Sequence, residues 1–240
     1  MRLLWEELSR AVPMILHGDP TLLSVIWFTI QVAVIATTGA AVIGLPIAVA
    51  IGLGRFRGRR TLQIIANASL GLPPVVAGFF MFLLFVPQGP LGGLHLNVTR
   101  RGVFVVQTLL ALPYVVALGA AAIQGLPPGL LGQARLLGAG RRQLSLFALR
   151  EARIGVMAAM IAALGTSLSE VGAIVIVGGN AYGYDQTLAS AILYEANAAH
   201  YADAVAIGIV LIGLILLLMC GLGVLQHQGD GIRWRFRSAA

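Results

Sequence analysis

Residues 24–53 read SVIWFTIQVAVIATTGAAVIGLPIAVAIGL and contain no charged side chain. A helix in hydrocarbon satisfies its own backbone hydrogen bonds and rises about 1.5 Å per residue, so crossing the bilayer core takes about 20 apolar residues. The run is longer than a straight crossing requires, and Pro46 predicts a kink, because proline lacks a backbone donor and crowds the preceding turn. The stretch therefore predicts a transmembrane helix.

Four further apolar runs follow, at 62–86, 103–123, 154–177 and 203–225. The chain of 240 residues is 58% hydrophobic and only 10% charged, with a mean hydropathy of +0.91, whereas an ordinary soluble domain is about a quarter charged. These values exclude a soluble globular protein. We expect an all-α, polytopic membrane protein with about five transmembrane helices, the second of them broken or bent at Pro73 and Pro74.

The arginines predict the orientation, because cytoplasmic loops of membrane proteins carry an excess of basic residues. All 16 basic residues are Arg, and they flank apolar runs instead of lining a face with aromatic residues, so no nucleic-acid partner is expected. An N-terminus outside the cell places twelve of the 16 in the cytoplasm: Arg55, Arg57, Arg59, Arg60, Arg135, Arg141, Arg142, Arg150, Arg153, Arg233, Arg235 and Arg237. We therefore expect the N-terminus outside and the C-terminal tail, residues 227–240, in the cytoplasm.

Residues 1–20 form a separate segment ahead of the transmembrane domain, residues 21–226. They are apolar enough to imitate a signal peptide, but Glu6 and Glu7 interrupt the apolar stretch, and no small-residue cleavage pattern precedes Ser24. Apolar residues at helical spacing opposite the charged ones predict a short helix lying in the membrane interface. A frayed tail explains the segment equally well.

Small residues recur every four positions along the first span, at Ala36, Ala40, Gly44, Ala48 and Gly52. A shorter ladder in the third span consists of Ala117, Ala121 and Gly125. Such ladders leave one helix face without bulk and allow a second helix to approach closely. Contacts within the chain are favoured over a subunit interface, because small residues are frequent in any membrane helix.

Residues that the chain lacks exclude several kinds of chemistry. It has no Lys, which excludes a phosphate-loop lysine and a Schiff-base lysine. Cys220 is the only cysteine, so neither an intrachain disulfide nor a multi-cysteine metal site is possible. No two histidines share metal-ligand spacing, and the spans contain a single carboxylate well inside them, which makes an intramembrane enzyme the weakest class. We predict no catalytic residue, metal site or cofactor in this chain.

The segment 126–153, between the third and fourth spans, does not belong in lipid. It contains the sequence PPGLLGQARLLGAGRRQLSLFALREAR at 127–153. Residues 130–137 are expected to form a short amphipathic helix closed by Gly138 or Gly140, and a second helical stretch starts near Arg141 and continues into the fourth span. A short helix of this kind suits docking into a groove on a soluble partner. From the pattern alone, a simple interfacial connector is the preferred interpretation.

The run Gln133-Ala134-Arg135-Leu136-Leu137-Gly138-Ala139 resembles the cytoplasmic signature of ABC importer permeases, in which a Glu-Ala-Ala triplet precedes a Gly by a fixed step. Ala134 and Gly138 are kept, whereas Gly132 and Gln133 stand where Glu and the first Ala are usual. The proline that often follows the signature is also missing.

Further motifs are similar to those of the tungstate-uptake permeases, a branch near the molybdate permeases. They are Leu72-Pro73-Pro74-Val75-Val76, Gly89-Pro90-Leu91-Gly92, Ala111-Leu112-Pro113, Ser169-Glu170-Val171-Gly172-Ala173 and Val177-Gly178-Gly179-Asn180. The last two are the most specific.

The resemblance implies a type I ABC importer permease that forms a homodimer in the cytoplasmic (inner) membrane. In such a protein Gln133, Ala134, Arg135, Gly138 and Ala139 would belong to a coupling helix that docks on one of two ATPase subunits. ATP and Mg would be bound by those partners, so this chain would be a transport subunit and not an enzyme. An extracytoplasmic binding protein would deliver the substrate, and Arg100 and Arg101 either contact that protein or simply flank the third span.

Glu170 is the one carboxylate well inside a predicted span. A charge at the bilayer centre costs at least ~2.5 kcal/mol, so Glu170 is expected to face protein or water. Thr166 and Ser167 lie about one turn before it on the same side. Because a carboxylate repels a dianion in a low-dielectric passage, we assign Glu170 to the gate, with a structural helix brace as an equal alternative. Thr166, Ser167 and Asn180 are neutral donors for transient oxyanion contact.

The sequence therefore predicts a permease subunit that moves an oxyanion, tungstate in the first place, inward by alternating access. Molybdate, sulfate or another oxyanion is an alternative substrate. An ATP-independent secondary transporter is the alternative class, in which proton coupling would depend on Glu170 alone.

Overall fold

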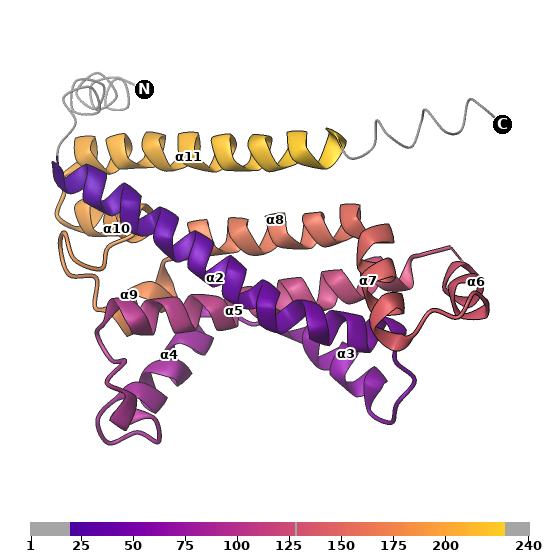
Figure 1. Cartoon of the computed structure of the whole chain (residues 1–240). Helices are drawn as coiled ribbons and strands as arrows, with labels where there is room; N and C mark the ends of the chain where they lie inside the picture. Colours follow the sequence, from indigo (N-terminus) through magenta and orange to yellow (C-terminus); the bar gives the residue numbers. More distant parts are fainter. Residues whose placement is uncertain (1–19, 128, 229–240) are drawn as a thin grey trace. The chain divides into compact units, whose positions relative to one another are not determined.

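The computed structural model describes residues 20–127 and 129–228, and all regular secondary structure in these ranges is helical. Three helices are long and apolar enough to cross a membrane: α2 (Pro20–Leu53), α5 (Arg100–Gln124) and α11 (Tyr201–Gln228) (Figure 1). The predicted all-α membrane fold is confirmed. The predicted interfacial helix at 1–20 and most of the predicted tail at 227–240 lie outside the described residues.

Two bent pairs of helices meet the same length and apolarity criterion. They are α3 (Arg59–Ser69) with α4 (Pro74–Phe85), bent by 106°, and α7 (Arg141–Glu151) with α8 (Arg153–Ser169), bent by 72°. Counting each pair as one span gives the five spans expected. The break in the predicted second span falls where it was expected, because Pro73 is the N-cap of α4 and Pro74 is its first residue. Pro46, by contrast, lies inside α2, which continues through it.

The prediction that residues 154–177 form one continuous helix was wrong. The helix stops after Ser169 and restarts as α9 (Gly172–Gly178), with Val171 outside helical geometry at φ −120° and ψ −52°. The segment from Arg141 also does not run straight into this span, because α7 ends at Glu151 before the bend into α8. The remaining short elements are η1 (Gly92–Leu94), α6 (Leu130–Leu136) and α10 (Leu188–Asn197).

The described chain divides into two compact units. The first unit contains residues 20–36, 72–110 and 164–218. The second unit contains residues 37–71, 111–163 and 219–228. The predicted gate residues belong to the first unit, and the predicted coupling segment belongs to the second.

The second unit is built on close contact between α2 and α5. Ala40 and Ala48 of the predicted ladder are completely buried. A Cβ atom at Gly44 would lie 2.9 Å from Val115 Cγ1, and one at Gly52 would lie 2.6 Å from Ile123 Cγ2. The ladder therefore packs within the chain, as the sequence favoured, and glycine is required where β-branched side chains of α5 face it.

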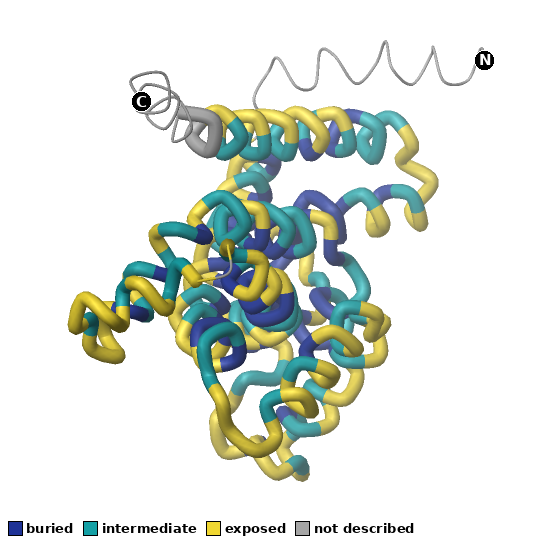
Figure 2. The backbone as a smooth tube through the Cα atoms, turned by 90° about the vertical axis from the view of Figure 1, so that its right-hand side faces the viewer, coloured by how far each residue is buried: buried dark blue, intermediate teal, exposed yellow. Residues whose placement is uncertain are grey.

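Apolar clusters fix the short helices of the first unit. One joins the start of α2 to α10 and α11 through Leu22, Val25, Leu188, Ala191, Ile207 and Leu211. Another joins α4, α5 and α9 through Phe85, Val106, Ala173 and Val177. Along α11 most of the surface is exposed or half-buried (Figure 2), and only 17% of its most apolar window is buried. That exposed apolar surface suits a lipid environment.

Contact between α4 and α9 depends on a residue without a side chain. A Cβ atom at Gly78 would lie 2.6 Å from Ala173 Cα, which is backbone and cannot move aside. We expect Gly78→Ala to destabilise the protein by about 1–3 kcal/mol, the usual effect of overpacking. Gly213→Ala, in α11, is the matched control because nothing lies within 4 Å of its Cβ position. Thermal unfolding in detergent measures both, and equal Tm values for the two variants would contradict the packing described.

Candidate coupling surface and transport-pathway residues

The helix α6 is a short, exposed element between two left-handed glycines. Gly129 precedes it with φ 88°, and Gly138 follows it with φ 85°. The amide of Gly138 donates to the Arg135 carbonyl at 3.0 Å, and the amide of Ala139 donates to the Ala134 carbonyl at 3.0 Å. The helix and its glycine stop are thus where the sequence predicted them, and Gly138 is required because a side chain at this φ is strained.

No residue of α6 is buried, and the leucines at its end point into solvent. Leu136 and Leu137 are each 89% exposed, the highest exposure among the large apolar side chains described. Leu131 holds the helix to its unit by packing against a cluster of Val49, Ile123, Ala148 and Ala152. Exposed leucines on an anchored helix form a surface that a partner protein can cover.

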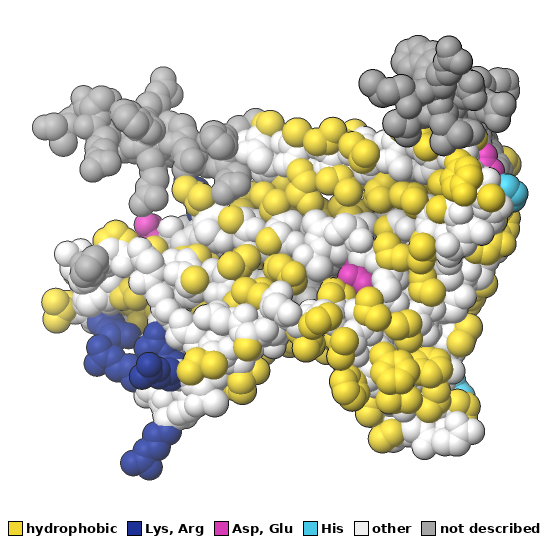
Figure 3. Space-filling view, turned by 180° about the vertical axis from the view of Figure 1, so that it is seen from behind, with side chains coloured by type: hydrophobic (Ala, Val, Ile, Leu, Met, Phe, Trp, Pro, Cys, Tyr) yellow, Lys and Arg dark blue, Asp and Glu magenta, His cyan; other side chains and the backbone are white. Residues whose placement is uncertain are grey.

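Arginines surround this helix. A groove of about 670 Å³ contains Arg55, Arg135 and Arg141 together with Leu53 and Phe56 among its walls. Basic side chains gather in one area of the face shown in Figure 3. Of the other predicted coupling residues, Gln133 and Gly138 are exposed and Ala134 and Ala139 are half-buried. The combination of positive charge and apolar surface matches the composition of protein interfaces.

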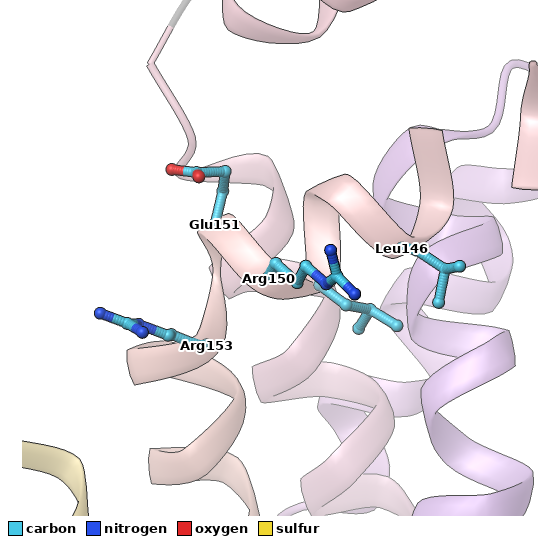
Figure 4. A pocket seen from close by; sticks show the side chains of 5 residues that line it. Leu146, Arg150, Glu151 and Arg153 are labelled. Carbon is cyan, nitrogen blue, oxygen red and sulfur yellow. The ribbon is translucent and has the colours of Figure 1, made fainter. Parts of the chain in front are cut away.

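A second cavity lies at the corner between α7 and α8. It has a volume of about 500 Å³ and is lined by Leu146, Leu149, Arg150, Glu151 and Arg153. Arg150 extends toward the side of Leu146, whereas Glu151 and Arg153 point the other way (Figure 4). This opposed arrangement does not converge on one ligand position.

Glu170 caps the short helix α9. Its side chain is 8% exposed, and its Oε1 accepts a hydrogen bond of 3.0 Å from the amide of Ala173. That amide lies in the first turn of α9, where backbone donors lack a partner within the helix. A Cβ atom at Gly172 would collide with Val75 of α4, so the chain turns here against another helix. The geometry matches the helix brace that the sequence left open as an alternative.

The neutral residues predicted beside Glu170 occupy different environments. Ser167 is 2% exposed and Thr166 is half-buried, both in the last turn of α8. Asn180 lies beyond the other end of α9, in left-handed geometry with φ 56°. Its Nδ2 donates to the Ser190 carbonyl at 3.5 Å, and its Oδ1 is buried and accepts no hydrogen bond from the described residues. The predicted residues therefore bracket α9 at its two ends.

The loop after α9 contains a buried carboxylate that sequence reasoning missed. Asp185 is completely buried, its Oδ1 accepts from the Ala181 amide, and its Oδ2 has no hydrogen-bond partner among the described residues. Burial raises the pKa of this carboxyl above its ordinary value of 3.8, although the Ala181 amide and the charge of Arg100 oppose the change. The turn-forming run Gly178-Gly179-Asn180, with Asp185 four residues after Ala181, was the sequence signal for such a loop.

Arg100 has a structural role that its sequence position did not reveal. Its Nε donates to the Tyr184 carbonyl at 2.6 Å, and its guanidinium lies 5.0 Å from the ring centre of Phe28 and 4.8 Å from that of Tyr184. These contacts join α2, α5 and the loop after α9 within the first unit. Gln107 of α5 was also missed: it is completely buried, and neither amide atom has a partner among the described residues.

Replacing Glu170 tests its capping role. Glu170→Ala leaves the Ala173 amide without an acceptor, and we expect a loss of about 1–2 kcal/mol. Glu170→Gln keeps an acceptor oxygen and should lose less than half of that. Thermal unfolding in detergent measures both, with Ser169→Ala as the control, since this exposed hydroxyl only donates to nearby carbonyls of α8. A loss in Glu170→Gln as large as in Glu170→Ala would show that the charge, not the acceptor, stabilises the helix.

Asp185 lies in a loop outside the predicted spans and should make stability depend on pH. Because its folded-state pKa is raised above 3.8, the folded protein binds more protons than the unfolded chain in the window above that value. Stability should therefore fall as the pH rises from about 4 toward the raised pKa. The measurement is the Tm of the wild type minus that of Asp185→Asn, which should decrease across this window. A constant or increasing difference would be inconsistent with a raised pKa.

Comparison with known proteins places the chain in a family. Residues 40–228 match the family described as the inner membrane component of binding-protein-dependent transport systems. A probable anion ABC transporter permease protein of Haloferax volcanii is 34% identical over 200 residues, which cover 81% of this chain and 86% of that protein. The tungstate uptake system permease protein of Peptoclostridium acidaminophilum is 25% identical over 228 residues, covering 95% of this chain and 100% of that protein.

A solved structure of the MetNI methionine ABC transporter, in an inward-facing conformation, has the same fold. Its TM-score with this chain is 0.70 at 22% sequence identity, and the alignment covers 88% of this chain and 99% of the other. The family match includes α6 with its glycine stop and most of the membrane-crossing helices. This chain belongs to the family of inner membrane components of binding-protein-dependent transport systems.

Proposed function

We propose that the chain is the permease subunit of an ATP-driven importer that carries a tetrahedral oxyanion, tungstate in the first place, across the cytoplasmic membrane. The observation that carries the proposal is α6: an anchored helix with no buried residue, with two leucines 89% exposed, inside a segment rich in arginine. Apolar side chains exposed to water are unfavourable in an isolated membrane protein, whereas an ATPase subunit that binds α6 would bury them. Family membership supports this role.

The proposed assembly contains two copies of this chain, two ATPase subunits and an extracytoplasmic binding protein. The ATPases would bind ATP and Mg, and this chain would transmit their movement through α6. With twelve of 16 arginines on the α6 side of the membrane, the proposed orientation has the N-terminus outside and α6 in the cytoplasm. Closure of the ATPases would then draw the two α6 helices together and switch the passage between outward-open and inward-open states.

Two observations support an oxyanion as the substrate. The described membrane helices carry no arginine within their apolar interiors, so the passage has no fixed cation that would hold a dianion tightly and slow its release. Glu170 uses Oε1 to cap α9, so we assign brief contacts with the substrate to the neutral residues Thr166, Ser167 and Asn180 and not to this carboxylate. A relative named for tungstate uptake aligns over nearly the whole chain, and this supports tungstate as the proposed substrate.

Replacing the exposed leucines of α6 tests the docking surface. We expect Leu136→Ser with Leu137→Ser to leave Tm nearly unchanged, because both side chains already face water. Affinity for the ATPase should fall by about tenfold or more, since exposed leucines become buried anchors only in the complex. Leu94→Ser is the matched control, because Leu94 is 60% exposed in η1, within the other unit. Unchanged copurification of the ATPase with the double variant would remove α6 from the interface.

Transport in proteoliposomes tests the function itself. The chain is reconstituted with its ATPase and binding protein. Uptake of tungstate is then measured with ATP on the side of the membrane that carries the ATPase, or with ATP only on the opposite side. We expect uptake only when ATP reaches the ATPase, with competition by molybdate, which has nearly the same size and charge, and not by sulfate. Tungstate flux through the chain without the ATPase would instead support the secondary transporter. Sulfate uptake without tungstate uptake would refute the proposed substrate.

A further inference from the structure

The turn between α10 and α11 brings together three metal-binding side chains that the sequence did not pair. Glu195 lies in the last part of α10, His200 ends the turn, and Asp203 lies in the first turn of α11. One ligand atom from each lies within 4.8 Å of the others. His200 Nδ1 is 2.9 Å from Glu195 Oε2, so an imidazole and two carboxylates face a common position.

The backbone of the turn holds these residues together. Ala199 adopts left-handed geometry at φ 62°, and the amide of His200 donates to the carbonyl of Glu195 at 2.9 Å. In turn, the carbonyl of His200 accepts from the amide of Ala204 at 3.1 Å, which starts α11. The distance between the ligand atoms is thus set by main-chain hydrogen bonds and not by the side chains alone.

A small cavity beside the cluster provides room for further ligands. Glu195 and Asp203 line it together with Gln186 and Tyr182, and its volume is about 50 Å³. That volume accommodates a few water molecules. Gln186 is 2% exposed, and its Nε2 donates to the Asn180 carbonyl at 3.5 Å. The side-chain amide of Gln186 therefore lines the same cavity as the two carboxylates.

The two carboxylates give the cluster a negative charge that a bound cation would offset. Neither Glu195 nor Asp203 pairs with an arginine among the described residues, and the sequence has no Arg or Lys between Arg153 and Arg233. Glu195 is only 8% exposed, and the described residue that can pair with it is His200, 2.9 Å away. Two carboxylates and one imidazole leave the cluster with an excess of negative charge, which a metal ion would offset.

We propose that Glu195, His200 and Asp203 form a site for one divalent transition-metal ion of the zinc type. Zinc accepts one imidazole and two carboxylates at about 2.0–2.2 Å and leaves a position for water, which the cavity supplies. Ligand atoms around tetrahedral zinc are about 3.4 Å apart, so Asp203 would move closer by roughly 1.4 Å at most, and the 2.9 Å pair of Glu195 and His200 would open slightly. Calcium is disfavoured because it prefers six to eight oxygen ligands. The ion would fasten the start of the sparsely buried α11 to α10.

Zinc titration of the full-length chain tests the site. Any purification tag is removed, because its histidines would bind zinc. The protein is then stripped of metal in detergent, and ZnCl₂ binding is measured by calorimetry. We expect one zinc ion per chain, at least tenfold weaker binding in His200→Ala and in Asp203→Asn, and no comparable binding of Mg²⁺ or Ca²⁺. Both positions are at least partly exposed, so these variants should fold. The visible absorption of Co²⁺ bound at the site should report the imidazole ligand and disappear in His200→Ala.

Other histidines serve as controls. His95 is exposed and lies directly after η1, away from the cluster in sequence, and His95→Ala should bind zinc as the wild type does. A variant with His17→Ala and His227→Ala should also keep full affinity. The proposal is overturned if the wild type shows no saturable binding, if His200→Ala binds zinc equally well, or if the binding is lost with the control histidines instead.

Discussion

A backbone inside a membrane has no water to satisfy its amides and carbonyls, and this constraint decides how the chain can interrupt a helix. The break between α8 and α9 is possible because Glu170 accepts the hydrogen bond of Ala173, an amide that the new helix start leaves without a partner. At the other end of α9, the amide of Val98 donates to the Val177 carbonyl at 2.9 Å. Protein groups thus replace the missing solvent at both ends of α9.

The same constraint explains why small residues recur where helices cross. With no hydrophobic effect between apolar helices in lipid, association depends on close contact. Within the second unit, Gly44 and Gly52 admit the β-branched side chains of Val115 and Ile123. Within the first unit, Gly78 admits the backbone of α9 at Ala173. The helices that carry the candidate pathway residues are therefore held by backbone proximity, and α6 is left as the least covered element of its unit.

Local signals in the sequence predicted a large part of this structure. Pro73 and Pro74 located the break in the second span, and Gly138 located the end of α6, because each acts through the backbone of its own neighbours. The prediction of a continuous span at 154–177 missed the break between α8 and α9, since this break depends on Val75 of another helix pressing against Gly172. The contacts of Arg100 within the chain were missed for the same reason, because its ring partners Phe28 and Tyr184 are remote in the sequence.

The metal-binding cluster shows a different limit of sequence reasoning. Histidine spacing gave no signal for Glu195, His200 and Asp203, because residues five apart, as Glu195 and His200 are, do not share a helix face. The left-handed residue Ala199 turns the chain so that they meet, and alanine gives no sequence signal for that geometry. Gly-rich or Asn-rich turns would have been recognised more readily.

The position of α6 in the cytoplasm is the claim on which coupling depends, and cysteine labelling tests it most directly. Cys220→Ser removes the only thiol, and Leu136→Cys then places one at a position that is 89% exposed in the wild type. A membrane-impermeant thiol reagent should label this cysteine only after the cells are opened, whereas Leu94→Cys in the same background should react in intact cells. Labelling of Leu136→Cys in intact cells would reverse the topology and separate α6 from any cytoplasmic motor.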